Sequence, residues 1–255
     1  MRFSLKLPAC VAVVATALAV AMPGFASPEQ PAGLSLTQFR LVYPASEKKG
    51  ITWSLTNNTD RAYLMQSWIR PLDAATGLPA AEEERKGPSA TIPLLVTPPL
   101  KRVEPGDPLQ LRLRITDMSL PQDRESVFYL SVKGIPSVPD KASQNGGQLV
   151  VAVVNNLKLF YRPEGLPEGG VKKAVQQLRF SLQGDVLVAD NPTPFYLNFS
   201  QLSVGGKPLP AAELRKLVPP KGQQRYAVSG GAQGAVEWQV LDEESQVTPL
   251  QRQTL

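Results

Sequence analysis

Proline and glycine recur along the whole chain at a spacing that leaves little room for long helices. The 255 residues include 25 prolines and 19 glycines, and proline inside a helix removes a hydrogen bond and clashes with the preceding turn. Short apolar runs with a period of two lie between these breaks. In residues 109–115, four aliphatic side chains alternate with polar ones, as they do in a strand with one buried face. The sequence therefore predicts β-structure and argues against a helical bundle.

Similar runs fall into two groups along the chain. They are residues 34–43, 51–56, 63–69, 109–115, 126–133 and 149–160, and then 178–183, 186–189, 195–202, 225–228 and 235–241. Turn-forming segments separate them and no helical crossover is predicted, which favours antiparallel sandwiches. The predicted fold is all-β, with two immunoglobulin-like β-sandwich domains in tandem. We expect an N-terminal domain at residues 33–162 and a C-terminal domain at residues 163–255.

The first 26 residues have the organisation of a secretory signal peptide. Arg2 and Lys6 give a basic start, residues 9–21 are apolar, and residues 24–26 resemble a small-x-small cleavage site. A membrane anchor is the alternative, but an apolar run of about 13 residues is shorter than the roughly 20 that span a bilayer. We expect cleavage after Ala26 and export to a periplasm.

The composition excludes most catalytic and metal chemistry. There is no histidine, and the only cysteine, Cys10, leaves with the signal peptide. Ser-His-Asp and Cys-His nucleophiles, His-ligated metals and Cys-ligated zinc are therefore excluded. The carboxylate run Glu82 to Glu84, beside Arg85 and Lys86, is typical of a solvated surface. We expect no catalytic residue, no metal and no cofactor.

Charge also argues against one class of partner. Loss of Arg2 and Lys6 lowers the formal net charge from +5 to +3. The remaining cations lie in segments of mixed sign, without a basic stripe interleaved with aromatic residues. Nucleic acid is therefore not an expected partner.

The stretch from Gln148 to Pro163 carries apolar side chains at both odd and even positions. A central strand buried on both faces explains this pattern. The alternative is an edge strand whose Leu149, Val151 and Val153 are kept for a partner. The residues alone leave both interpretations open.

Six motifs follow one another along the chain. They are FRLVY at 39–43, YLMQSWI at 63–69, TPPLKRVEPG at 97–106, LPQDRESVFY at 120–129, LKLFYRP at 157–163 and NPTPFY at 191–196. In this order they resemble the motifs of the periplasmic pilus-assembly chaperones, the PapD-like family of the chaperone–usher pathway. Ser131 departs from that pattern, because family members often carry asparagine there.

The resemblance implies a binding function, exercised in a cleft between two domains that are set at an angle. The family counterparts of Arg40 and Lys158 bind the C-terminal carboxylate of a pilus subunit in that cleft. Leu149, Val151 and Val153 align with the strand that completes the subunit's unfinished sandwich. The implied partners are thus fimbrial subunits and an outer-membrane usher. Self-association of the free chaperone through this strand is left open.

Two further expectations concern the chaperone itself. The family pattern places Glu125, Arg162 and Asp242 together at the domain junction as an internal ion network. Without the resemblance, these residues would be taken as exposed and unrelated surface charges. Val150 lies on the opposite face of its strand from Val151, and we expect it in the chaperone's own core.

Two other protein classes compete with this interpretation. A structural fimbrial subunit or adhesin would have one incomplete sandwich, whereas two complete ones are predicted. A periplasmic carbohydrate-binding module or hydrolase would need an aromatic platform or a carboxylate pair in a cleft, and the chain has only 17 aromatic residues. Within the family, the absence of a cysteine pair from the mature chain favours the branch with the shorter loop before the donated strand.

Overall fold

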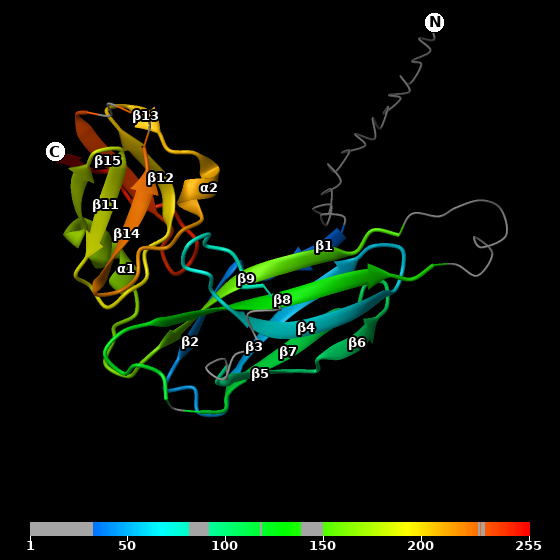
Figure 1. Cartoon of the computed structure of the whole chain (residues 1–255). Helices are drawn as coiled ribbons and strands as arrows, with labels where there is room; N and C mark the ends of the chain where they lie inside the picture. Colours follow the sequence, from blue (N-terminus) through cyan, green and yellow to red (C-terminus); the bar gives the residue numbers. More distant parts are fainter. Residues whose placement is uncertain (1–32, 82–91, 118, 139–149, 229, 231–232) are drawn as a thin grey trace, which may run out of the picture. The chain divides into compact units, whose positions relative to one another are not determined.

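The computed structural model describes residues 33–81, 92–117, 119–138, 150–228, 230 and 233–255, and within them strands predominate (Figure 1). The first group of strands is β1 (Gly33–Leu36), β2 (Arg40–Pro44), β3 (Ile51–Asn58), β4 (Tyr63–Pro71), β5 (Leu94–Thr97), β6 (Leu100–Val103), β7 (Pro108–Ile115), β8 (Ser126–Pro136) and β9 (Val153–Arg162). The second group is β10 (Arg179–Gln183), β11 (Val186–Asn191), β12 (Phe199–Val204), β13 (Lys207–Pro208), β14 (Gly222–Ala227), β15 (Ala235–Val240) and β16 (Gln251–Thr254). Short helices accompany the second group: α1 (Gly170–Ala174), the 3-10 helix η3 (Val175–Gln177) and α2 (Ala211–Leu214).

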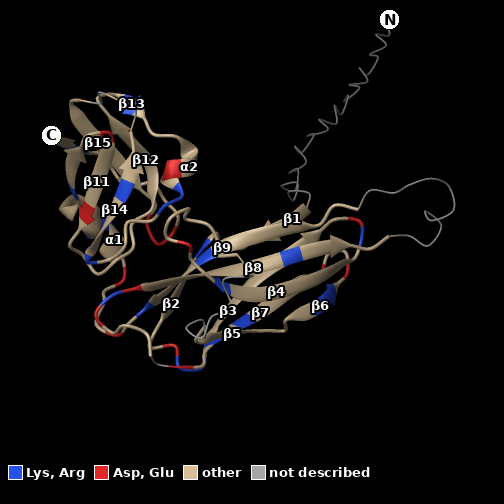
Figure 2. Cartoon of the chain, in the orientation of Figure 1, with Lys and Arg blue, Asp and Glu red and all other residues tan. Residues whose placement is uncertain are grey.

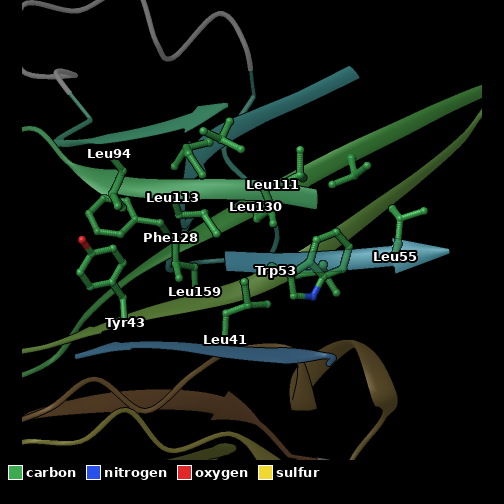
Figure 3. Close-up of a cluster of buried hydrophobic side chains, with 14 of the residues drawn as sticks. Leu41, Tyr43, Trp53, Leu55, Leu94, Leu111, Leu113, Phe128, Leu130 and Leu159 are labelled. Carbon is green, nitrogen blue, oxygen red and sulfur yellow. The ribbon is translucent and has the colours of Figure 1, made fainter. Parts of the chain in front are cut away.

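The first nine strands form two sheets that enclose one core. Their orders are β1-β3-β7-β5 and β2-β9-β8-β4-β6. Strand β2 runs parallel to β9, whereas β9 is antiparallel to β8. Alternation along β7 buries Leu109, Leu111 and Leu113 completely, and they pack in one cluster with Trp53 and Leu159 (Figure 3). This shared apolar core is what holds the two sheets together.

The remaining strands build a second, smaller sandwich. Its sheets have the orders β10-β11-β14 and β13-β12-β15-β16. A separate core joins them, and Trp238 lies at its centre with its ring centroid 4.7 Å from that of Phe180. The indole Nε1 donates to the carbonyl oxygen of Val175 at 3.2 Å, so its polar atom is satisfied inside the core.

The prediction of an all-β chain with two domains is confirmed. Several boundaries differ from expectation. The run at 34–43 is divided between β1 and β2, which belong to different sheets, and the run at 149–160 becomes a strand only from Val153. Strands β5, β6, β13 and β16 were not predicted, since each has four residues or fewer and too few positions to reveal a period. In the described part of the chain, no helix has the length and apolarity to cross a bilayer.

Candidate functional site

Two cations lie side by side where β2 meets β9. The parallel register pairs Arg40 with Lys158. Because side chains alternate along a strand, Lys158, Phe160 and Arg162 share the face of β9 opposite to Leu157 and Leu159, which enter the N-terminal core. This outer face of β9 therefore carries two cations around one aromatic ring.

Arg40 is a buried cation without an ionic partner. The residue is only 8% exposed, and its Cζ lies 3.8 Å from the centroid of the Phe160 ring. Its Nε and Nη2 atoms are buried and make no hydrogen bond within the described chain. Burial holds the pKa of the guanidinium below its ordinary value. Arginine donors that are buried and unused are costly, so this position is suited to receiving an anion.

Lys158 completes the cationic pair. Its Nζ donates to the Oδ1 of Asn198, a buried residue whose Nδ2 donates to the carbonyl oxygen of Phe199 at 3.2 Å. Burial, and secondarily the charge of Arg40, lowers the pKa of Lys158 to about 8. Of the residues that the structure describes, no carboxylate forms a salt bridge with either cation. A carboxylate from outside the chain could therefore bind both through charge-assisted hydrogen bonds.

Beyond these cations, β9 continues as an exposed strand with one free edge. Strand β2 begins opposite Lys158, so among the described residues Val153 to Leu157 pair only with β8. Val151 is 62% exposed and Val153 is 51% exposed. Leu149 lies outside the described residues. Exposed branched aliphatic side chains on an unpaired edge are the features that a strand-adding partner uses.

Both interpretations of the stretch from Gln148 to Pro163 therefore apply, each to a different part. Residues 157–162 are mostly buried. Residues 158–161 pair on both edges, whereas Leu157 pairs only with β8 and Arg162 only with β2. Val150 and Val154 are each 42% exposed. The expectation that Val150 lies in the chaperone's core is wrong, because this exposure is far above that of a core residue.

Arg162 has surroundings opposite to those of Arg40. Its Nη2 donates to Glu125 Oε1 at 2.7 Å and to Glu243 Oε1 at 3.0 Å, and its Nε donates to Glu125 Oε1 at 3.0 Å. The second oxygen of Glu125 accepts the backbone N–H of Tyr196 at 2.9 Å. Arg162 and Glu125 are 3% and 1% exposed, so this is a buried and paired ion network between segments far apart in the sequence, in which only Glu243 Oε2 is buried without a hydrogen bond in the described chain.

The carboxylate that joins this network belongs to Glu243 and not to Asp242. Asp242 is buried, but its Oδ1 accepts the backbone N–H groups of Glu244 and Gln246 at 3.0 and 2.8 Å, and its Oδ2 lies 3.3 Å from Lys172 Nζ. Asn198 is not among the predicted site residues, and its only signal in the sequence is its place two residues after the NPTPFY motif. The described residues contain no cluster of three or more side chains suited to holding a metal ion.

Other charges of both signs are distributed over strands and loops (Figure 2). They form mostly exposed pairs, such as Lys48 with Glu164 at 2.6 Å and Lys221 with Asp123 at 2.7 Å. Such surface pairs contribute little to stability. The clusters around Arg40 and Arg162 differ from these pairs because their charges are buried.

Family comparisons agree with this architecture over most of the chain. The family model described as "Pili and flagellar-assembly chaperone, PapD N-terminal domain" matches residues 33–167, and "Pili assembly chaperone PapD, C-terminal domain" matches residues 173–249. Chaperone protein FocC of Escherichia coli is 35% identical over 215 residues, which cover 82% of this chain and 84% of the relative. Chaperone protein FimB/FhaD of Bordetella pertussis is 33% identical over 241 residues, 92% of this chain and 93% of the relative.

Solved structures show the same likeness. A chain in the complex of the Salmonella enterica SafA pilin with the SafB chaperone matches with a TM-score of 0.72 and 27% identity, covering 89% of this chain and 98% of that one. The Escherichia coli chaperone DraB matches with a TM-score of 0.69 and 28% identity, covering 88% and 98%. The chain belongs to the PapD-like family of periplasmic pilus-assembly chaperones.

Proposed function

We propose that this protein binds fimbrial subunits in the periplasm, completes their fold by lending them β9, and delivers them to an outer-membrane usher. Its relatives include fimbrial chaperones, and one solved relative was captured with a pilin. A subunit that lacks its last strand exposes an apolar groove and unpaired backbone groups, which promote aggregation. A chaperone that covers both would keep such a subunit soluble without an energy source.

The exposed part of β9 supports the strand-lending step. Val153 to Leu157 offer unpaired backbone groups along one edge, and each backbone hydrogen bond formed there contributes about 0.5–1.5 kcal/mol. Val151 and Val153 supply the apolar side chains, and Leu149, which continues the same alternation in the sequence, is proposed to join them. Each contributes up to about 1.5–3 kcal/mol when fully buried in a groove.

Arg40 and Lys158, which form no salt bridge within the described chain, supply the register. A subunit whose terminal carboxylate binds Arg40 and Lys158, and whose last strand pairs with Val153 to Leu157, must run parallel to β9. Since side chains alternate, a slip of one residue would turn every apolar side chain away from its pocket. Fixing the chain end at Lys158 therefore fixes which subunit residues meet Val151 and Val153.

One observation carries the proposal: the edge of β9 that is unpaired among the described residues leads directly to the buried Arg40 and the half-buried Lys158, and neither cation has a carboxylate partner in the described chain. The test is affinity purification of the protein from periplasm, followed by identification of what co-purifies. We compare the parent with Arg40→Ala, Val151→Asp and the control Leu95→Asp, which alters a side chain that is 51% exposed on β5.

The parent and Leu95→Asp are each expected to co-purify with a small fimbrial subunit in an amount equal to their own, because the proposed binding surface is intact in both. Arg40→Ala and Val151→Asp should carry none. A sugar, or no partner at all, would contradict the proposal. Equal capture by all four proteins would show that neither the cations nor the strand is used.

We further propose that residues 1–26 are a signal peptide cleaved after Ala26, and that the two domains comprise residues 33–162 and 163–255. The family models leave residues 1–32 unmatched and change over between residues 167 and 173. Mass spectrometry of the periplasmic protein tests the cleavage site. A mature chain that still contains Cys10 would contradict it.

A further inference from the structure

The two free cations line a pocket whose other walls are largely apolar. Its volume is about 540 Å³, and its polar lining includes Arg40, Lys158 and Asn198, together with Asn156 and Arg215. The apolar lining comes from Phe39, Leu78, Pro79, Leu157, Phe160 and Leu241. Pockets of this size with few polar groups and apolar walls usually take small ligands or side chains.

Two large apolar side chains of this pocket remain open to solvent. Phe39 is 66% exposed and Leu78 is 44% exposed. Both are adjacent to the cationic pair in the pocket, and Phe39 directly precedes Arg40 in the chain. An anionic group that also carries an apolar side chain would thus match both the charge and the surface of the pocket.

Leu78 is held in place by a rigid turn. The backbone N–H of Asp73 donates to the carbonyl oxygen of Leu78 at 2.9 Å, and that of Gly77 donates to the carbonyl oxygen of Asp73 at 2.8 Å. The hydroxyl of Tyr129 donates to the carbonyl oxygen of Gly77 at 2.5 Å. Gly77 has a φ of 71°, and a Cβ there would lie 2.2 Å from the carbonyl oxygen of Arg215. Only glycine fits this approach, so these contacts define the backbone of the turn that carries Leu78.

We propose that this pocket is a specificity subsite for the last side chain of the bound subunit, and that it selects an aliphatic or aromatic C-terminal residue. The inference rests on the proposed function, in which the terminal carboxylate binds Arg40 and Lys158. Because the carboxylate and the side chain are joined to the same Cα, anchoring one places the other within a few bonds of the pocket wall. Phe39 and Leu78 then cover the terminal side chain and exclude water from the ion pair.

The test uses synthetic peptides of alternating Val and Ser with a solubilising N-terminus, titrated into the mature protein. Four endings are compared: Phe, Leu and Gly with a free carboxylate, and Phe as the carboxamide. The Phe and Leu acids are expected to bind about 10- to 100-fold more tightly than the Gly acid, as burial of one large apolar side chain would give. In Leu78→Ala the ratio of Phe to Gly affinity should fall severalfold, whereas the control Leu95→Ala should keep the parent ratio.

The results distinguish the proposed side-chain subsite from the proposed carboxylate anchor. Equal affinity of the Phe and Gly acids, or an unchanged ratio in Leu78→Ala, would overturn the subsite. The proposed anchor would still stand if the Phe acid bound more tightly than its carboxamide. Equal binding of acid and carboxamide would overturn the carboxylate anchor, and a failure of all four peptides to bind would contradict both.

Discussion

Arg40 and Arg162 are both buried arginines on paired strands, yet their surroundings are opposite. Arg162 donates to the carboxylates of Glu125 and Glu243 within 3.0 Å. Arg40 lies on an aromatic ring with two nitrogen atoms unused, beside a second cation. A buried charge is tolerated when it is paired, and costs stability when it is not. The comparison thus separates a cation that forms internal ion pairs from one that we propose binds a ligand.

The largest expected effect comes from breaking the satisfied cluster. Arg162→Met should lower the free energy of unfolding by about 3–5 kcal/mol, because it leaves the fully buried Glu125 carboxylate without its counter-ion. A denaturant melt measures this. The double variant Arg162→Met with Glu125→Gln removes both charges and should be more stable than Arg162→Met alone. A single variant that melts within about 1 kcal/mol of the parent would show that the network does not stabilise the fold.

Removal of the Arg40 charge should weaken ligand binding but leave the stability nearly unchanged. Arg40→Met is expected to leave the free energy of unfolding unchanged or slightly higher, since the buried guanidinium has no salt bridge within the described chain and only its contact with the Phe160 ring is lost. Binding of the peptide ending in a free carboxylate should weaken by about 2–5 kcal/mol, as for other truncated charge pairs. Titration and melting of the same preparation give both values. If Arg40→Met instead unfolds the protein as Arg162→Met does, the distinction between the two arginines fails.

A carboxylate introduced beside Lys158 should convert the cation site without a counter-ion into one that is paired internally. Asn198→Asp places a carboxylate where Lys158 now donates to a neutral amide oxygen, so it supplies the internal counter-ion that this site lacks. We expect peptide affinity to fall at least tenfold, because the new carboxylate competes with that of the ligand. Asn198→Ser, which retains a neutral acceptor, is the matched control and should bind nearly as the parent does. Equal affinities of the two variants would argue that the neutrality of residue 198 is irrelevant.

The pH dependence should separate binding from stability. Burial lowers the pKa of Lys158 to about 8 in the folded protein, whereas the unfolded chain keeps the ordinary, higher value. Above pH 8 the unfolded chain therefore binds more protons, and the free energy of unfolding should rise by about 1 kcal/mol between pH 7.5 and 9. Peptide affinity should fall by about tenfold over the same range, because the ammonium that meets the carboxylate is lost.

Lys158→Met provides the reference for this measurement. The differences between parent and variant isolate Lys158 from other groups that titrate in this range. Parent and variant with the same slope of stability against pH would contradict a perturbed Lys158. An affinity that does not change up to pH 9 would mean that the ammonium does not contact the ligand.

A structural feature can be predicted from the sequence when the residues that form it lie close together along the chain. Alternation within eight residues predicts β7, because burial of Leu109, Leu111 and Leu113 is a local consequence of the pleat. Pairing of β2 with β9 joins Arg40 to Lys158 across more than a hundred residues, and no local pattern encodes it. The resemblance to a family brought these two cations together in the prediction, whereas their composition and spacing gave no reason to separate them from surface charges.

The smallest expected effect on stability concerns Asp242, which the family resemblance predicts to be in the ion network, and its neighbour Glu243. Asp242 Oδ1 accepts two backbone N–H groups of its own turn, and its ionic contact is with Lys172, whose side chain is 56% exposed. Asp242→Asn keeps an oxygen for the turn and loses only this screened pair, so stability should change by about 0–1 kcal/mol. Glu243→Gln should cost more stability, because Glu243 Oε1 accepts from the buried Arg162 and from the backbone N–H of Val171 at 3.3 Å.

Denaturant melts of the two variants, each also made in the Arg162→Met background, test this assignment. Glu243→Gln should lose most of its effect once Arg162 is absent, whereas Asp242→Asn should be unaffected by that background. If Asp242→Asn instead lost its effect in the Arg162→Met background while Glu243→Gln kept its own, Asp242 would belong to the network and Glu243 would not.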